Sequence, residues 1–123
     1  MSADGWIEFA ELRRRLATTT SVIERWAHLA PSIDRVGERV RREEAVLLAL
    51  AVRLRQHGLT AATTRTAVAQ LLTVVDRPAA ADWVVVTDGP KRATVHVGGV
   101  VDLDRRATVQ IVDAGELRAL LDA

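Results

Sequence analysis

Residues 37–60 read GERVRREEAVLLALAVRLRQHGLT, a change from dense charge to a nearly unbroken apolar run. Glu43 and Glu44 place negative charge where a helix beginning there has the positive end of its dipole. Arg53 and Arg55 stand near the other end of the run, and Gly58 is the residue type that most often ends a helix. The stretch therefore predicts a long helix over residues 43–57, with Ala, Val and Leu on its inner side.

Two shorter helices are predicted before it. Apolar residues recur at helical spacing over residues 9–17, and the run TTTS at 18–21 interrupts that helix and supplies an N-cap for the next. The second helix turns its apolar side chains inward and ends before Pro31. Residues 31–42 lose the apolar periodicity and have a glycine at their centre, which predicts a short hairpin.

After residue 60 the pattern changes from helical to extended. Thr60 caps a further helix that runs to about residue 75, and residues 77–82, rich in alanine, are predicted to be a linker. Alternating β-branched residues then predict strands, and the last residues predict a closing helix. The strands are expected at 83–87, 94–97, 100–103 and 108–112, with a turn at 88–91 and the helix at 113–121.

These elements predict an α+β fold. Its first part, residues 1–76, is expected to be a helical domain. Its last part, residues 83–123, is expected to be a small antiparallel β-rich segment with a closing helix, used for dimerisation or for binding a partner or ligand.

Length and composition exclude several classes of protein. The chain has 123 residues, 49% of them hydrophobic, and no cysteine, so disulfides, thiolate metal sites and cysteine nucleophiles are excluded. No apolar run approaches the roughly 18 residues that cross a bilayer, and a cytoplasmic location is expected.

All but one of the 17 basic residues are arginines, and residues 1–80 hold 12 of them against nine carboxylates. Arginine binds phosphate through two parallel hydrogen bonds, so this half of the chain is a candidate for polyanion binding.

Catalytic motifs are missing from the sequence. His28, His57 and His96 have no metal-ligand spacing, and the glycine-containing segments at 88–90 and 98–99 fit turns better than phosphate-binding loops. We therefore expect no catalytic residue, no metal and no cofactor, and a protein that is not an enzyme.

A helix, a four-residue turn and a second helix ending in Trp26 form a helix-turn-helix unit. Together with residues 37–60, this unit resembles the MerR-like winged helix-turn-helix family over about residues 6–75. The resemblance implies that residues 1–76 are a winged helix-turn-helix DNA-binding domain. That family has a glycine-tipped wing with a G-x-R pattern, then acidic residues and a long helix ending in L-R-x-x-G-[LF]-[ST]. The segment LRQHGLT at 54–60 matches that ending at every position.

The resemblance implies roles for individual residues. Arg39 falls on the wing arginine that the family uses against the phosphate backbone, and Trp26 falls on an aromatic position that packs the recognition helix. Three positions depart from the family: Glu24 stands where an arginine is usual, and Glu38 and Arg41 replace aromatic residues of the wing. The long coiled coil that dimerises typical members is absent.

The resulting hypothesis is a sequence-specific, double-stranded DNA-binding transcriptional regulator of repressor-like type, associated with the nucleoid. The second helix would read the major groove, and the arginine-rich wing would contact the backbone. Useful specificity requires two copies, so a homodimer or cooperative self-association is expected, while a small-molecule effector is left open. The alternatives are a phage or architectural DNA-binding factor and a protein-interaction module whose helix-turn-helix no longer binds DNA, since a carboxylate at position 24 repels phosphate. The candidate DNA-binding residues are Thr20, Ser21, Glu24, Arg25, His28, Arg35, Arg39, Arg41 and Arg42.

Overall fold

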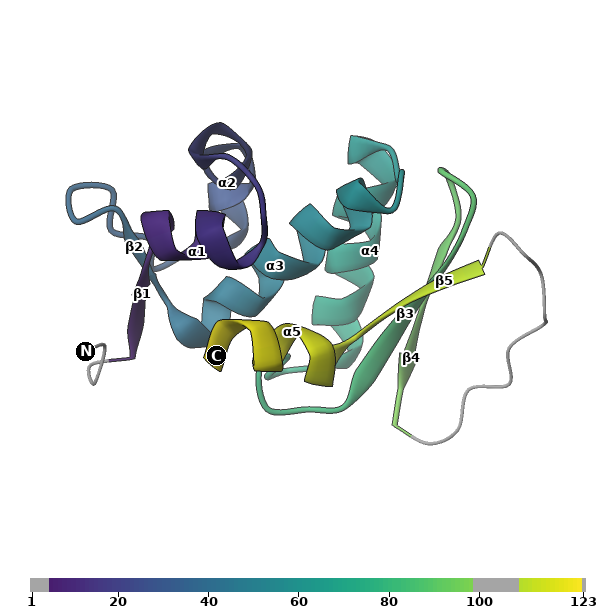
Figure 1. Cartoon of the computed structure of the whole chain (residues 1–123). Helices are drawn as coiled ribbons and strands as arrows, with labels where there is room; N and C mark the ends of the chain where they lie inside the picture. Colours follow the sequence, from purple (N-terminus) through teal and green to yellow (C-terminus); the bar gives the residue numbers. More distant parts are fainter. Residues whose placement is uncertain (1–4, 99–108, 123) are drawn as a thin grey trace.

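The computed structural model of the chain describes residues 5–98 and 109–122, and it has a helical part and a sheet part side by side (Figure 1). Its elements in chain order are β1 (Trp6–Glu8), α1 (Phe9–Arg15), α2 (Thr20–Trp26), the 3-10 helix η1 (Ala27–Leu29), β2 (Arg39–Arg41), α3 (Arg42–Gln56), α4 (Ala61–Val74), β3 (Trp83–Asp88), β4 (Ala93–Val97), β5 (Val109–Asp113) and α5 (Ala114–Asp122).

A tight turn separates α1 from α2, as the hydroxyl-rich run predicts. Ala17 adopts a left-handed backbone conformation with φ 51°. Thr19 then caps α2, because its side-chain oxygen accepts a hydrogen bond from the Val22 N–H at 3.3 Å. The buried face of α2 holds Ile23 and Trp26, so the helix is locked against the core while its other face stays in solvent.

The hairpin expected over residues 31–42 is present as one antiparallel bridge between Asp34 and Arg39. The longer pairing was not predicted: β2 pairs antiparallel with β1, and Ile7 lies opposite Val40. Both of these side chains are buried. Strand β1 escaped prediction because three residues are too few to show a period-two pattern.

Helix α3 is the centre of the fold. All residues from 45 to 52 are buried, which confirms the long helix and shows that it is covered on every side over two turns. Helix α4 packs on it and begins at Thr60, whose hydroxyl oxygen accepts a hydrogen bond from the Thr63 N–H at 3.1 Å.

The second sheet has the order β4-β3-β5, with both pairings antiparallel. Val85 of the central strand lies opposite Val95 and Val112. Side chains of β3 alternate, with Trp83, Val85 and Thr87 buried and the residues between them half-buried. The additional strand expected at 100–103 lies outside the described residues.

The segment between α4 and β3, expected to be a linker, is held at several points. The Trp83 indole donates a hydrogen bond to the Pro78 carbonyl at 2.8 Å, and Arg118 of α5 donates to the Ala81 carbonyl at 2.8 Å. Helix α5 packs against α3 and α1, and buried residues from both halves of the chain form one hydrophobic core. The protein is α+β, as the sequence predicts.

Candidate nucleic-acid interface

One face of α2 is polar and exposed. Four of its residues, Thr20, Ser21, Glu24 and Arg25, are exposed, as is His28 in the following helix η1, and Arg25 has no ion-pair partner among residues 5–98 and 109–122. The His28 ring nitrogen Nδ1 lies 3.1 Å from the Arg25 carbonyl oxygen, which orders the helix end next to this face. Helices α2 and η1 thus expose two hydroxyls, a guanidinium, an imidazole and a carboxylate that a partner could contact.

Strands β1 and β2 bring an aromatic ring under two wing arginines. The guanidinium carbon of Arg39 lies 4.5 Å from the centroid of the Trp6 ring, and that of Arg41 lies 4.8 Å away. Strand pairing places Trp6 directly opposite Arg41, which explains the contact. A stacked guanidinium keeps its N–H groups in the plane of the group, where they can still donate to other acceptors, so the stack orders the arginine without using its donors.

The tip of the wing is built around one carboxylate. Asp34 accepts a hydrogen bond from the Gly37 N–H at 2.9 Å and another from Arg39 Nε at 3.1 Å. These two bonds, that of Gly37 first, lower the pKa of Asp34 below its usual value. A side chain at position 37 would place its Cβ 2.7 Å from a carboxylate oxygen of Asp34, so only glycine fits this turn without a shift. Within the turn Arg35 and Val36 are exposed to solvent, Val36 being 99% exposed.

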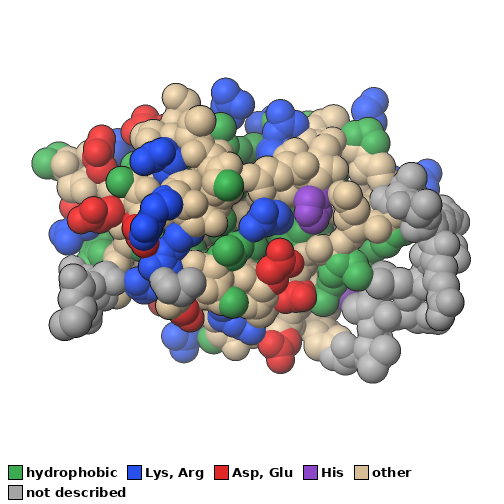
Figure 2. Space-filling model, viewed as in Figure 1, with side chains coloured by type: hydrophobic (Ala, Val, Ile, Leu, Met, Phe, Trp, Pro, Cys, Tyr) green, Lys and Arg blue, Asp and Glu red, His purple; other side chains and the backbone are tan. Residues whose placement is uncertain are grey.

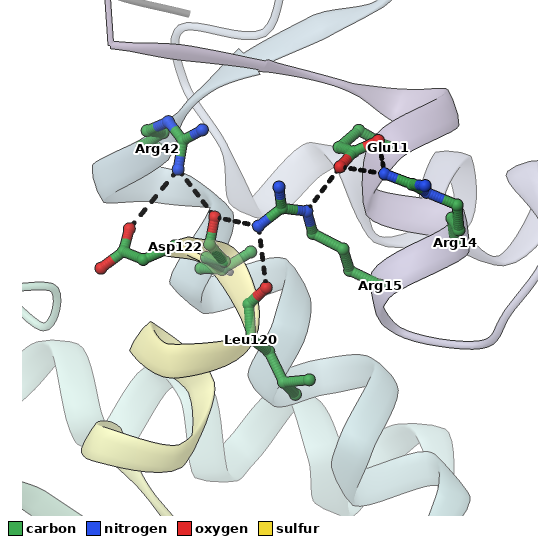
Figure 3. A network of polar contacts seen from close by, with 7 residues as sticks. Glu11, Arg14, Arg15, Arg42, Leu120 and Asp122 are labelled. Atoms are coloured by element: carbon green, nitrogen blue, oxygen red, sulfur yellow. Dashed lines mark hydrogen bonds and ion pairs between the residues drawn. The ribbon is translucent and has the colours of Figure 1, made fainter.

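Arg42 has a different position from the other wing arginines. It is the first residue of α3, and its Nη1 donates to the Leu121 carbonyl at 2.7 Å and lies 3.4 Å from the Asp122 carboxylate (Figure 3). Arg15 of α1 reaches the same helix end, donating to the carbonyls of Leu120 at 3.0 Å and Leu121 at 2.6 Å. The two arginines satisfy the last carbonyls of α5, which have no partner within the helix.

Charges of both signs lie on the wing and α2. Over residues 19–41 the arginines are Arg25, Arg35, Arg39 and Arg41, and the carboxylates are Glu24, Asp34 and Glu38. Figure 2 shows the same mixture over the N-terminal half of the visible face, including its upper left edge, whereas Lys and Arg side chains lie along the middle and right of the upper edge. A uniformly basic footprint is therefore absent from the wing region itself.

Two residues of this region were not identified from the sequence. Trp6 is half-buried and stacks with Arg39 and Arg41 of the wing. Arg15 donates to the last carbonyls of α5 and so caps that helix. No local signal marks either role. The alternation of half-buried Trp6, buried Ile7 and exposed Glu8 is typical of a short strand, and it is the one hint of β1 that the sequence contains.

Among the described residues, no three His, Asp or Glu side chains gather closely enough to hold a metal ion. No helix in that same part of the chain has the length and apolar character needed to cross a bilayer.

Comparison of the chain with family models, with curated proteins and with solved structures gave no significant match.

Proposed function

We propose that the protein is a sequence-specific, double-stranded DNA-binding regulator of winged helix-turn-helix type, with the MerR-like resemblance of residues 6–75 as its sequence basis. It would act as a repressor-like transcription factor at the nucleoid. One observation carries the proposal. An N-capped helix of seven residues buries Ile23 and Trp26 and exposes a polar face, and it is followed by a wing whose arginines are ordered on Trp6.

The two parts of this surface would contact DNA differently. The hydroxyls of Thr20 and Ser21 and the guanidinium of Arg25 are groups that hydrogen-bond base edges in the major groove. Arg35 and Arg41 are exposed at the wing, where guanidinium groups suit backbone phosphates. Arg42 is left out of this contact set, because it donates to the end of α5.

A single module of this size contacts few base pairs, so the proposal includes a homodimer or cooperative binding. Residues 83–121 are the proposed place of self-contact. Val97 of β4 and Ile111 of β5 are large apolar residues that are 51% and 40% exposed there, on the two edge strands of the sheet.

The experiment is a fluorescence-anisotropy titration with DNA from upstream of the protein's own gene and with a scrambled duplex. Arg25→Ala is expected to lower affinity for the native duplex by about 5- to 100-fold and to reduce discrimination between the two. Arg35→Ala is expected to weaken binding to the native and the scrambled duplex equally and to reduce the slope of log affinity against log salt concentration by about one. Arg77→Ala, an exposed arginine in the segment after α4, is the matched control and should leave both affinities unchanged.

Absence of binding by the wild-type chain to either duplex at low salt contradicts the proposal. Equal, salt-sensitive binding to both duplexes would replace specific recognition with an architectural role.

A second candidate function is a protein-interaction module that does not bind DNA. It is favoured by Glu24 on the exposed face of α2, by Glu38 in the wing turn, and by Val36, a fully exposed apolar residue at the wing tip. Reversing charge with Arg35→Glu separates the two functions. A partner complex that survives this substitution, in a chain that binds no duplex, supports the interaction module.

A further inference from the structure

A cleft of about 440 Å3 lies between α4 and the β3–β4 hairpin, away from the wing. Polar side chains line it from both elements. They are Thr63, Thr66 and Gln70 from α4, and Lys91, Arg92 and Thr94 from the hairpin.

This cleft carries uncompensated positive charge. Lys91 and Arg92 are exposed, and neither has an ion-pair partner in the described part of the chain. No carboxylate lines the cleft, and residues 45–75, which include all of α4, contain three arginines and no Asp or Glu. Asp88 begins the same turn and is half-buried, with its N–H donating to the Arg92 carbonyl.

The hairpin turn is fixed against the helix. The Thr60 N–H donates to the Pro90 carbonyl at 2.9 Å, which joins the turn to the residue that caps α4. Gly89 supplies the left-handed conformation of the turn, with φ 74°. Lys91 and Arg92 therefore extend from a backbone that is already placed, and little conformational entropy of the main chain is lost when they bind.

The hairpin turn that carries Lys91 and Arg92 and the start of the candidate recognition helix α2 lie along the same edge of the molecule (Figure 1). In Figure 1 the wing loop before β2 lies at one end, the turn between β3 and β4 lies near the other, and the start of α2 and the α3–α4 connection lie between them along the upper edge. In the same view, Figure 2 shows Lys and Arg side chains along this edge.

We propose that this basic cleft binds backbone phosphates of the duplex, in the part that flanks the base pairs read by α2. Lys91 and Arg92 provide the charge, and the Gln70 amide provides a further neutral hydrogen-bond donor. The contact positions the protein on the duplex and carries no base specificity, since phosphates are the same at every base pair. This inference rests on the proposed function, because it extends the DNA contact of the same chain.

The test compares two duplexes containing the same recognised sequence, one of about 12 base pairs and one of about 24, roughly one and two helical turns. Affinity is measured by anisotropy over a range of salt concentrations. The variants are Arg92→Glu, the double substitution Lys91→Glu with Arg92→Glu, and Arg77→Glu as the matched control for Arg92→Glu. All three residues are exposed, and circular dichroism checks that each variant is folded.

The wild-type chain is expected to bind the longer duplex more tightly, with a salt slope steeper by about 1.8, which corresponds to two phosphates. The double variant should lose this difference and retain the short-duplex affinity, whereas Arg77→Glu should keep both. An unchanged long-duplex affinity and slope in the double variant overturns the inference and leaves the proposed function standing. No binding of the wild-type chain to either duplex overturns the proposed function, and the inference with it.

Discussion

The end of α5 offers a sharp test of how the C-terminal helix is held to α1. Arg15 donates from Nη1 to two carbonyls of that helix end, at 3.0 and 2.6 Å, and from Nε to Glu11 at 2.7 Å. Its neighbour Arg14 binds the same Glu11 carboxylate at 2.6 Å and forms no hydrogen bond or ion pair with residues 114–122 of α5. The two side chains also differ in burial, Arg15 being 17% exposed and Arg14 72%. Replacing each with methionine keeps the unbranched aliphatic part and removes the charge.

Arg15→Met is expected to lower the free energy of unfolding by about 2 kcal/mol. A hydrogen bond from a charged donor contributes about 1.5 to 3 kcal/mol, and the two carbonyls share one nitrogen, so they are counted as one bond. The positive charge at a helix C-terminus adds about 0.5 kcal/mol, and water that reaches the exposed helix end offsets a similar amount. Arg14→Met should change the stability little, because exposed ion pairs contribute little.

The assay is urea denaturation followed by tryptophan fluorescence and circular dichroism. A loss of about 2 kcal/mol corresponds to a fall in melting temperature of roughly 6–8 °C for a chain of this size. A second measurement follows the carboxyl group of Glu11 by NMR. Its pKa is lowered by Arg15 first and Arg14 second, so it should move further back toward 4.5 in Arg15→Met than in Arg14→Met.

Equal stability losses in the two variants would refute this reasoning. So would a larger loss in Arg14→Met, because either result would mean that the bonds to α5 contribute nothing beyond the surface pair.

Three further predictions concern single side chains. Burial and the nearby Arg53 lower the pKa of His57 in the folded chain, so the unfolded chain binds a proton there more readily. The free energy of unfolding should therefore fall as pH drops from 6.5 toward the lower pKa of the folded state. Denaturation at several pH values should show a flatter dependence of stability on pH for a His57→Gln variant. Trp83→Phe removes the bond to the Pro78 carbonyl and part of a buried ring, and calorimetry should show a loss of about 2 kcal/mol; a change below about 0.5 kcal/mol would contradict the role given to this indole. Thr60→Ala should cost about 1 kcal/mol through loss of the α4 cap, while Thr60→Ser, which keeps the hydroxyl, should lose less when the two are compared by urea denaturation.

The helices were predictable because their signals are local. Thr19 and Thr60 cap α2 and α4 as hydroxyl residues before an apolar run do, and the nearly uniform apolar composition of residues 45–52 marks a helix buried on all sides. The helix boundaries shifted by only a few residues, since terminal turns depend on their tertiary contacts. The strands of the second sheet followed from the same kind of signal, a period of two over five or six residues.

The candidate site was predictable only in part. Spacing along α2 correctly separates the exposed residues from Ile23 and Trp26, because a helix of known phase has a known buried face. The wing is different, since the partner of each arginine there depends on a strand 30 residues earlier that no pattern marks. Arg39 and Arg41 lie on Trp6 only because β1 pairs with β2 in one register.

The sequence by itself determined where the chain is helical or extended, which faces are apolar, and which residues can cap, since these properties depend on neighbours within one or two turns. The tertiary structure alone decided which arginines remain available to a partner. Arg15 and Arg42 reach the end of a helix about 80 to 105 residues later in the chain, whereas Lys91 and Arg92 do not meet a carboxylate within the described residues. A guanidinium or ammonium group binds whichever acceptor the fold brings within about 3 Å, and no local spacing encodes that encounter.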